Sequence, residues 1–268
     1  MRFAFHKMHG LGNDFVVVDA RVTAFPVDAA LARGIADRHR GIGCDQLILL
    51  EPARDADLTM RIFNADGSEV EACGNATRCV AALVGGDVAI ATAGGLLHAS
   101  AAGGGANVDM GGPRFDWDGI PLAYAMDTLT MPVGWEGLAQ PAAVNVGNPH
   151  VIFFVPDLDA VDLARLGPLI EHDPLFPQRI NVNVAQMLAP DHIRLAVWER
   201  GAGLTRACGT GACATAVAAI RRGLASGPLT VTLPGGPLVI DWVPGGRILM
   251  RGPATHVFSG EADTDAFR

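Results

Sequence analysis

The chain has 268 residues, of which 50% are hydrophobic and 18% are charged. This length is sufficient for one large domain or for two of ordinary size, each with its own core. The formal net charge of −8 comes from 20 basic and 28 acidic residues without a run of like charge, which argues against nucleic acid or an anionic membrane as a partner. No apolar stretch is long enough to span a membrane, and the first residues lack the apolar segment of a signal peptide, so we expect a cytoplasmic protein.

Lysine is nearly absent, which excludes two common cofactor classes. Lys7 is the single lysine, against 19 arginines. A phosphate-binding P-loop requires a lysine within the string GxxxxGK[ST], which the chain lacks. A pyridoxal phosphate enzyme requires a Schiff-base lysine, and the residues around Lys7 are not typical of a cofactor site. We therefore expect neither of these cofactor classes.

The five cysteines favour neither a disulfide framework nor a metal site. An odd number of cysteines in an intracellular chain argues against structural disulfides. Cys73 and Cys79 are six residues apart, and Cys208 and Cys213 are five apart, whereas structural zinc sites usually have C-x-x-C pairs. We therefore expect no metal ion.

The first half of the chain combines short apolar runs with two helical segments. Asp28 is a predicted N-cap for a helix that continues to about Arg38, and an apolar helix is predicted over residues 74–84. A glycine-rich stretch at 103–105 and the turn at 111–113 indicate a domain boundary near residue 115. Strands are predicted at residues 15–19, 46–50, 58–63, 87–92, 96–100 and 106–110.

The second half repeats this order of elements. Helices are predicted over residues 159–171 and 209–222, and strands at 151–155, 182–187, 193–198, 229–233, 237–242 and 247–251. Many short strands with two helices in each half favour an α+β fold in which a curled sheet surrounds a helix. We expect one domain at residues 1–115, with the C-terminal tail of about 255–268 packing back on it, and a second domain at 116–254.

Two similar segments, ACGNATRC at 72–79 and ACGTGAC at 207–213, indicate an internal duplication. Their first cysteines, Cys73 and Cys208, are 135 residues apart, about half the chain. The same shift relates further glycine and polar positions without a gap, namely Gly12-Asn13 to Gly147-Asn148, Gln46 to Asn181, Asn64 to Glu199, and Gly74 to Gly209. We therefore expect two homologous halves related by pseudo-twofold symmetry, with the matched residues meeting between them.

In each half a cysteine is predicted at the start of a short helix. Unsatisfied N–H groups and the positive end of the helix dipole at that place lower the pKa of a thiol and favour binding of a carboxylate. Two such helix starts, facing one small acid, would place the thiols of Cys73 and Cys208 on opposite sides of its α-carbon. One thiolate would remove the α-hydrogen and the other thiol would return a proton, which inverts the carbon without a cofactor.

Such an exchange requires that the two thiols have unlike surroundings, because one must be deprotonated while the other keeps its proton. The sequence predicts this difference. Glu199 stands where the first half has Asn64, and His150 stands where it has Phe15.

Other interpretations stay open for several of these residues. A cysteine near the start of an apolar helix is often a small buried hydrophobe, which is the role that we expect for Cys44, Cys79 and Cys213. Asn13 and Asn148 follow glycines and could be turn residues. The alternative functions are a racemase for another small amino acid such as proline, a thiol redox protein with a reversible disulfide between the two repeated cysteines, and a binding module without catalysis.

Five segments together resemble the diaminopimelate epimerase family. They are HGLGNDF (9–15), NADGSEVEACGNATRC (64–79), GNPH (147–150), RINVN (179–183) and ERGAG…ACGTGAC (199–213), in the order typical of that family. The resemblance implies two pseudo-symmetric domains, each a mainly antiparallel, β-barrel-like sheet around a central helix, with the active site in the cleft. It also implies an isomerase, independent of pyridoxal phosphate and of metals, that interconverts LL- and meso-2,6-diaminopimelate for the synthesis of lysine and peptidoglycan.

Residue by residue, the resemblance implies that Cys73 and Cys208 are the acid/base thiols, and that His150 and Glu199 tune their pKa values. Arg200 would hold the distal carboxylate of the substrate in a fork. The reacting carboxylate would bind to the backbone at Gly74-Asn75 and Gly209-Thr210. The full set of implied substrate-binding residues is Asn13, Gln46, Asn64, Gly74, Asn75, Asn148, Asn181, Glu199, Arg200, Gly209 and Thr210.

Two positions depart from the pattern of the family. Leu204 stands where an acidic residue is frequent, and Ala76 where glycine is common. Neither is a proposed catalytic group. Members often form dimers through their C-terminal region, and Phe258 matches a tyrosine often found there, so a homodimer is a further hypothesis.

Overall fold

The computed structural model describes residues 1–71 and 73–267, and its chain divides into two compact units. Unit 1 comprises Met1–Val108 together with Gly252–Arg268, and unit 2 comprises Asp109–Arg251. The boundaries predicted near residues 115 and 254 lie a few residues from these. Among the described residues, no helix is long and apolar enough to cross a membrane.

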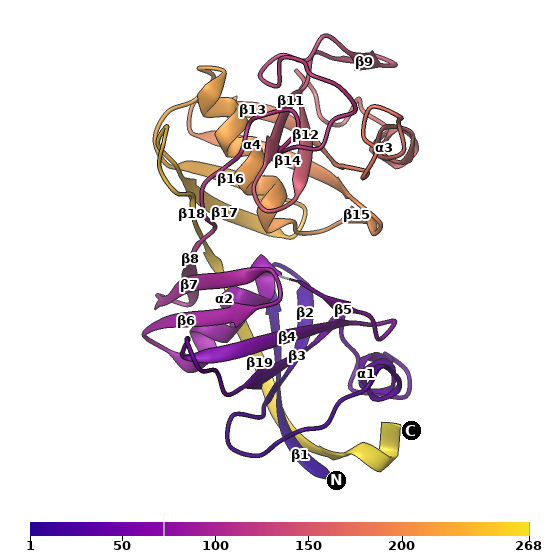
Figure 1. Ribbon diagram of the computed structural model, residues 1–268, viewed down its shortest axis with the longest axis vertical. Coiled ribbons are helices and arrows are strands. Elements are labelled where there is room, and N and C mark those ends of the chain that lie inside the picture. Colours follow the sequence, from indigo (N-terminus) through magenta and orange to yellow (C-terminus); the bar gives the residue numbers. More distant parts are fainter. Residues whose placement is uncertain (72, 268) are drawn as a thin grey trace. The chain divides into compact units, whose positions relative to one another are not determined.

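Unit 1 combines short strands with two α-helices (Figure 1). The helices are α1 (Ala29–Ala36) and α2 (Gly74–Val84), and a 3-10 turn, Thr264–Phe267, follows the last strand. The strands are β1 (Arg2–Gly10), β2 (Asn13–Asp19), β3 (Gln46–Glu51), β4 (Leu58–Asn64), β5 (Glu69–Val70), β6 (Asp87–Thr92), β7 (Gly95–Ala102), β8 (Gly105–Asp109) and β19 (Thr255–Asp263). The central helix, α2, contacts β1, β2, β6, β7 and β19.

Unit 2 has the same plan, with α4 (Gly209–Arg221) as its central helix and α3 (Leu163–Glu171) outside the sheet (Figure 1). Its strands are β9 (Gly134–Trp135), β10 (Leu138–Ala139), β11 (Ala142–Asn145), β12 (Pro149–Phe154), β13 (Asn181–Ala189), β14 (His192–Glu199), β15 (Gly203–Thr205), β16 (Leu229–Leu233), β17 (Gly236–Asp241) and β18 (Leu249–Pro253). α4 contacts β11, β12, β13, β14, β16 and β17. Alanines at 212, 214, 216, 218 and 219 are buried, and such small side chains allow strands to approach the helix closely on several sides.

The predicted α+β class is confirmed: each unit is a mainly antiparallel sheet around a central helix. The exceptions are parallel pairs, and they occur at equivalent places in the two units: β2 with β3 and β4 with β6 in unit 1, β12 with β13 and β14 with β16 in unit 2. The helices predicted at 74–84 and 209–222 are confirmed as α2 and α4, the latter ending one residue earlier.

The duplication extends to the register of the strands. Phe15 pairs with Gln46 in unit 1, and the residues 135 positions later, His150 and Asn181, pair in unit 2. The next ladder repeats in the same way, since Ile62 opposite Val70 corresponds to Val197 opposite Thr205. After the central helices the shift grows: Leu58 pairs with Ile90, but Ile193 pairs with Val231. The repeat is therefore gapless from β2 to α2, which is the part that carries the candidate site residues.

The sequence analysis missed several strands, namely β1, β5, β9, β10, β11, β15 and β19, and placed the start of one helix too early. The long strand β1 was missed, because its burial alternates only in part and a glycine-rich turn follows it. The tail at about 255–268, for which packing on the first domain was expected, is mostly strand β19, which pairs antiparallel with β1 of unit 1. The helix predicted from residue 159 begins at Leu163, since the carboxylate of Asp162 caps it by accepting the backbone N–H of Arg165.

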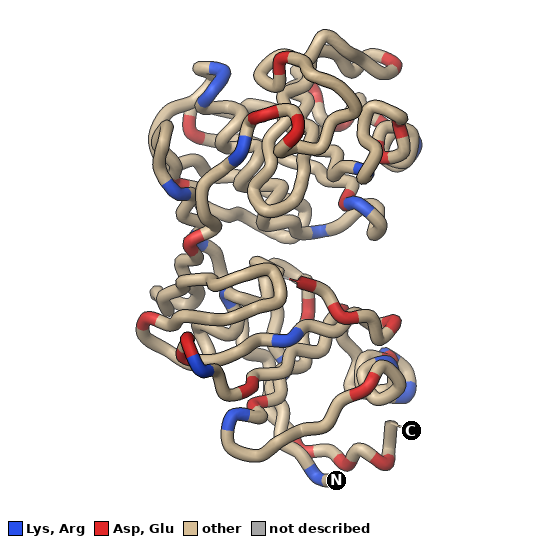
Figure 2. The backbone as a smooth tube through the Cα atoms, viewed as in Figure 1, with Lys and Arg blue, Asp and Glu red and all other residues tan. Residues whose placement is uncertain are grey.

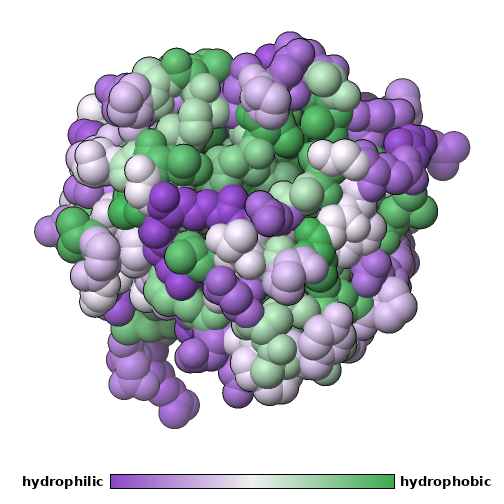
Figure 3. Space-filling model, turned by 90° about the horizontal axis from the view of Figure 1, so that it is seen from above, coloured by the Kyte–Doolittle hydropathy of each residue, from purple (hydrophilic) through white to green (hydrophobic). Residues whose placement is uncertain are grey.

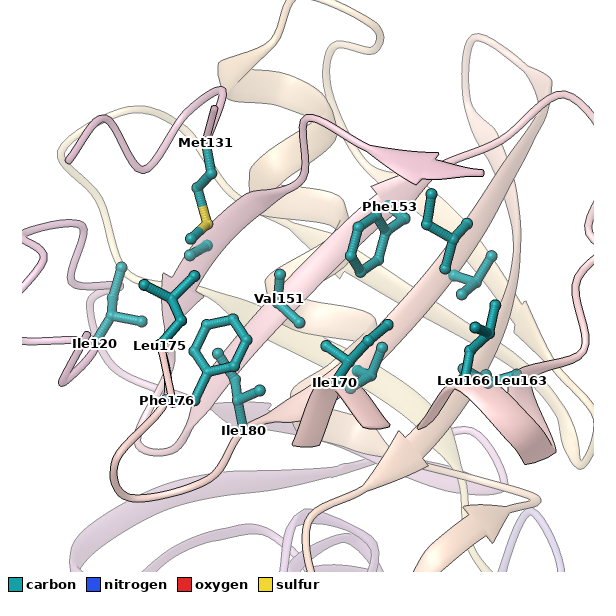
Figure 4. Close-up of a cluster of buried hydrophobic side chains, with 14 of the residues drawn as sticks. Ile120, Met131, Val151, Phe153, Leu163, Leu166, Ile170, Leu175, Phe176 and Ile180 are labelled. Carbon is teal, nitrogen blue, oxygen red and sulfur yellow. The ribbon is translucent and has the colours of Figure 1, made fainter. Parts of the chain in front are cut away.

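The core of unit 2 shows how the strand period separates two faces of the sheet. Val151 and Phe153 on β12 point toward Leu166 and Ile170 of α3, whose spacing of four places them on one side of that helix (Figure 4). Alternate residues point to the opposite face. His150 on β12 is therefore directed away from this apolar cluster and toward α4.

Charged and hydrophobic residues are both dispersed over the surface. Basic and acidic residues are scattered over both units (Figure 2). The face in Figure 3 shows hydrophobic groups lying between hydrophilic ones. Scattered exposed apolar side chains are ordinary in globular proteins.

A substitution at Gly167 of α3 would test how closely this helix packs against the sheet. A Cβ at this position would lie 2.4 Å from Cδ2 of Trp198, whose indole is held by a hydrogen bond to Glu171. Alanine normally stabilises a helix relative to glycine, but here we expect Gly167→Ala to lower the free energy of unfolding by about 2 kcal/mol. Chemical denaturation measures this change. Leu169→Ala on the exposed side of α3 is the control, and an unchanged or higher stability of Gly167→Ala would contradict the packing described.

Candidate functional site

Cys73 lies at the start of α2, as its N-cap residue, next to two asparagine side chains. Its Sγ donates to Oδ1 of Asn13 over 3.8 Å, and Nδ2 of Asn75 donates to the same oxygen over 3.1 Å. The buried guanidinium of Arg78 donates to Oδ1 of Asn75 over 2.9 Å, which orients the Asn75 amide. The first turn of α2 therefore holds Asn13 against the thiol.

The other side of Asn13 is held by a network of charges. Nδ2 of Asn13 donates to Asp45 over 2.9 Å, and Arg38 bridges Asp45 and Asp14. Lys7 also donates to Asp14. Burial alone would raise the pKa of Asp14, but hydrogen bonds from Arg38 and Lys7 lower it well below its ordinary value. The orientation of the Asn13 amide is thus determined from both sides.

Gln46 and Asn64 form a second amide pair in unit 1. They are opposite each other on β3 and β4, and Nε2 of Gln46 donates to Oδ1 of Asn64 over 3.0 Å. Nδ2 of Asn64 donates to the hydroxyl of Ser68 over 3.0 Å. The amide oxygen of Gln46 is buried and accepts no hydrogen bond from any described residue.

Cys208 is the N-cap of α4 and is the counterpart of Cys73 in unit 2. It is only 4% exposed, and its Sγ accepts the backbone N–H of Gly211 over 3.3 Å and lies 3.6 Å from Oγ1 of Thr210. We expected the helix N-terminus to lower the pKa of this thiol. Instead the pKa lies well above its ordinary value, because burial and the nearby carboxylate of Glu199 outweigh the hydrogen bonds from Thr210 and Gly211.

Glu199 ends β14 beside Cys208. Burial raises the pKa of its carboxyl group, although hydrogen bonds from Thr205 and Cys208 partly oppose this effect. Both acids of the pair are therefore shifted toward their protonated forms, so that a proton is retained on the pair.

His150 is completely buried and lies between two amides. Its Nδ1 is 3.2 Å from Oδ1 of Asn183 and its Nε2 is 3.0 Å from the side chain of Asn148. Burial lowers its pKa to about 4, with a smaller lowering by Arg200 and an opposing effect of the bond to Asn183. Among the described residues, its hydrogen-bond neighbours are these amides rather than Cys208.

Arg200 lies in the turn between β14 and β15, and its backbone is held by two side chains of unit 2. The buried amide of Asn181 accepts the N–H of Arg200 over 2.9 Å and donates to the carbonyl of Pro149 over 2.8 Å. The carboxylate of Glu171, on α3, accepts the N–H of Gly201 over 2.9 Å. The guanidinium of Arg200 is exposed and donates to the carbonyl of Gln178.

The predicted residues thus form small groups within each unit. Unit 1 groups Cys73 with Asn13 and Asn75, and Gln46 with Asn64; unit 2 groups Cys208 with Glu199 and Thr210, His150 with Asn148, and Asn181 with Arg200. Gly74 and Gly209 are the first residues of α2 and α4. No group of three His, Cys, Asp or Glu side chains that could hold a metal occurs among residues 1–71 and 73–267.

Several supporting residues were missed. They are Asp45, Ser68, Arg78, Glu171, Asn183 and Thr205. Asp45 and Asn183 are adjacent or nearly adjacent in sequence to the predicted residues Gln46 and Asn181, which was a usable signal. Glu171 ends an amphipathic helix far from the motifs in sequence, and no local pattern marks it.

Solved structures with the same fold define its class. A phenazine biosynthesis protein of the PhzF family from Bacillus anthracis has a TM-score of 0.71 at 17% identity, with 98% of this chain and 99% of that chain covered. A hydroxyproline epimerase from Agrobacterium vitis, solved with bound trans-4-hydroxy-L-proline, has a TM-score of 0.66 at 16% identity, with 97% and 92% covered. The chain has the two-unit fold shared by these proteins.

Closer relatives identify the family within this fold. Residues 5–115 and 142–257 match the sequence model of diaminopimelate epimerase. A diaminopimelate epimerase from Rhizorhabdus wittichii is 68% identical over 100% of this chain and 98% of its own length, and one from Zymomonas mobilis is 63% identical over the full length of both. The chain belongs to the diaminopimelate epimerase family.

The burial of the thiols predicts an order of chemical reactivity. Alkylation requires an accessible thiolate, so near neutral pH we expect iodoacetamide to modify Cys73 first, because it is partly exposed, and Cys208 much more slowly. Cys44, Cys79 and Cys213 are buried and should react only after denaturation. Peptide mass spectrometry over time measures the order, with Cys73→Ser as the control for assignment. Equal rates at Cys73 and Cys208 would contradict the burial described here.

Proposed function

We propose that the protein interconverts LL- and meso-2,6-diaminopimelate in the cytoplasm, with Cys73 and Cys208 as its two acid/base groups and without a cofactor. Membership of the family supports the reaction, which serves the synthesis of lysine and peptidoglycan. One observation carries the assignment of the residues: each unit places a cysteine as the N-cap of its central helix, at positions equivalent in a gapless repeat.

In the proposed reaction the thiolate of one cysteine takes the α-hydrogen as a proton. The C–H bond breaks, an S–H bond forms, and the electron pair stays on the α-carbon and its carboxylate. The thiol of the other cysteine gives its proton to the opposite face, which forms a new C–H bond and inverts the carbon. The roles of the two thiols exchange in the reverse direction. Glu199 supports this step, because it can accept the proton of Cys208 before the reaction.

The carbanion needs electrostatic stabilisation, since an α-hydrogen of an amino acid is a very weak acid. The first N–H groups of α2, at Gly74 and Asn75, and those of α4, at Gly209 and Thr210, are suited to bind the reacting carboxylate. Negative charge that spreads onto this carboxylate during proton removal is stabilised by the same groups. This is the contribution that a cofactor would otherwise supply.

The remaining polar residues support a substrate with two polar ends. The guanidinium of Arg200 is exposed and can form a bidentate pair with the distal carboxylate. The unoccupied oxygen of Gln46 can accept from an ammonium group, and Asn13, Asn64, Asn148 and Asn181 supply or support neutral amides around it. A proline racemase would have no use for a second carboxylate site.

Exchange of the α-hydrogen tests this function. The reduced protein is incubated with LL-diaminopimelate in D₂O, with a chelator and no added cofactor, and NMR follows loss of the α-hydrogen signal alongside formation of the meso isomer. We expect deuterium to enter with inversion, and both Cys73→Ala and Cys208→Ala to lower the rate by at least about a thousandfold.

Cys213→Ala, in the same helix as Cys208 but buried in the core, is the matched control and should retain activity. Exchange from proline alone would overturn the substrate. Absence of exchange from any amino acid would overturn the epimerase, and redox activity of the oxidised pair would then favour the thiol redox protein.

We also propose that two copies associate through β19. Val257 is 53% and Phe258 47% exposed on this strand, although Phe258 contacts the ring of Phe5 on β1. A second copy would bury these side chains. We expect sedimentation to show a dimer that Phe258→Glu weakens at least tenfold, while Val22→Glu, at a 97% exposed position of unit 1, leaves it intact. A monomeric wild-type protein at micromolar concentration would overturn the dimer.

A further inference from the structure

His150 presents a problem of hydrogen-bond direction, because oxygen atoms of two amides face its ring. Nδ1 lies 3.2 Å from Oδ1 of Asn183, and Nε2 lies 3.0 Å from Oδ1 of Asn148. A neutral imidazole has one N–H and can donate to only one of them. The ring is fully buried, and burial opposes the doubly protonated cation. One of the two amides must therefore present its N–H₂ group to the ring instead.

The orientation of Asn183 is determined by its other partners. Its Nδ2 donates to the carbonyl oxygen of Gly211 and to Oγ1 of Thr215, both over 3.0 Å, and both residues lie on α4. A backbone carbonyl can only accept, so reversing the amide would place two oxygens against each other in a fully buried place. Oδ1 of Asn183 must therefore face His150, where it needs a donor.

Asn148 has no such constraint from its side-chain partners. It lies in the turn before β12, is partly exposed, and its side chain meets His150 at one end. The two ends of an amide have nearly the same shape, so its orientation follows from its hydrogen-bond partners. Of the two amides at the ring, Asn148 is the one that can turn.

We propose that Asn183 is a positioning residue that holds His150 as the Nδ1–H tautomer, so that Nε2 accepts from Asn148 and the amide oxygen of Asn148 is presented to the substrate. The hydrogen bonds then run in one direction, from Asn148 through His150 and Asn183 to the Gly211 carbonyl of α4. An amide oxygen of Asn148 that faces the substrate favours a hydrogen-bond donor on it, such as the ammonium group of an amino acid. This last step rests on the proposed function, whereas the tautomer does not.

The repeat shows that the fold itself does not need this polar chain. The residues of unit 1 that match His150, Asn183 and Thr215 are Phe15, Ile48 and Val80, which are all apolar and fully buried. Burying a polar group lowers the stability of a fold unless the group forms hydrogen bonds. All three positions nevertheless differ together between the two units. Three polar residues that differ together in this way are better explained by a functional role in unit 2 than by the packing of its core.

The tautomer can be measured directly. In protein with ¹⁵N-labelled histidine, long-range ¹H–¹⁵N NMR spectra distinguish a protonated from an unprotonated ring nitrogen, and His150→Phe assigns the signals. We expect a protonated Nδ1 and an unprotonated Nε2 near neutral pH. A protonated Nε2, or a cationic ring, in the wild-type protein would overturn the proposal whatever the activity is.

Asn183→Leu removes the acceptor while keeping a similar volume. We expect it to abolish the single Nδ1–H tautomer and to raise KM for diaminopimelate about tenfold, with a smaller change in kcat. Gln186→Leu makes the same replacement on β13 at an amide that bonds elsewhere, to the carbonyl of Pro156, and should change neither property. An unchanged tautomer in folded Asn183→Leu would also overturn the proposal, and if that variant does not fold, the wild-type spectrum still decides.

The two proposals fail in different ways. If the wild-type protein does not turn over diaminopimelate, the proposed function and the role of Asn148 toward the substrate are overturned together. The assignment of the His150 tautomer is then decided by the NMR spectrum alone. If turnover is normal and the KM of Asn183→Leu is unchanged, the substrate step of this proposal is wrong and the proposed function is unaffected.

Discussion

Each unit encloses a helix within a sheet, and the first turn of an enclosed helix still has backbone N–H groups that need partners. Much of the candidate site follows from this constraint. A cysteine is the N-cap in both units, and the amide and carboxyl side chains gather at the same end of the helix. Away from this end the helices are lined by small apolar residues, which allow close packing but provide no chemistry. Within the helices, polar side chains such as Arg78 and Thr215 hold the amides Asn75 and Asn183.

The two units show how a shared backbone can support different chemistry. Equivalent strands of the two units have the same register. A side chain near the thiol that differs between the units therefore changes the environment of that thiol. Cys73 is partly exposed and faces Asn13, whereas Cys208 is buried and faces Glu199, the counterpart of Asn64. The duplication supplies two similar frameworks, and a few substitutions give the two thiols unlike surroundings.

The parts of this structure that could be predicted from sequence are those with a local signal. Glycine and cysteine have special roles in the backbone and in chemistry, so their recurrence at one shift predicted the repeat and the helices α2 and α4. The only local signal for Asn183 is its place two residues after Asn181, because an asparagine within an apolar strand is compatible with many environments. Its partners on α4 are 28 and 32 residues away in sequence, and only the folded chain brings them to it. Glu171 was missed for the same reason, since the backbone N–H that it accepts, at Gly201, is 30 residues away. The strand β1 was missed because its burial alternates only in part, and one of its two partner strands, β19, lies at the other end of the chain.

The cap of α4 has a consequence for the motion of the protein during a reaction. The N–H of Gly211 donates to the sulfur of Cys208, and a sulfur atom accepts a hydrogen bond far better as an anion than as a neutral thiol. Loss of the thiol proton therefore tightens the first turn of α4, and its return loosens it. In unit 1 the thiol is directed to Asn13, so the same proton affects a side chain rather than the helix cap. In the reaction proposed above, the charge on the sulfur of Cys208 would therefore also set how firmly the first turn of α4 is held.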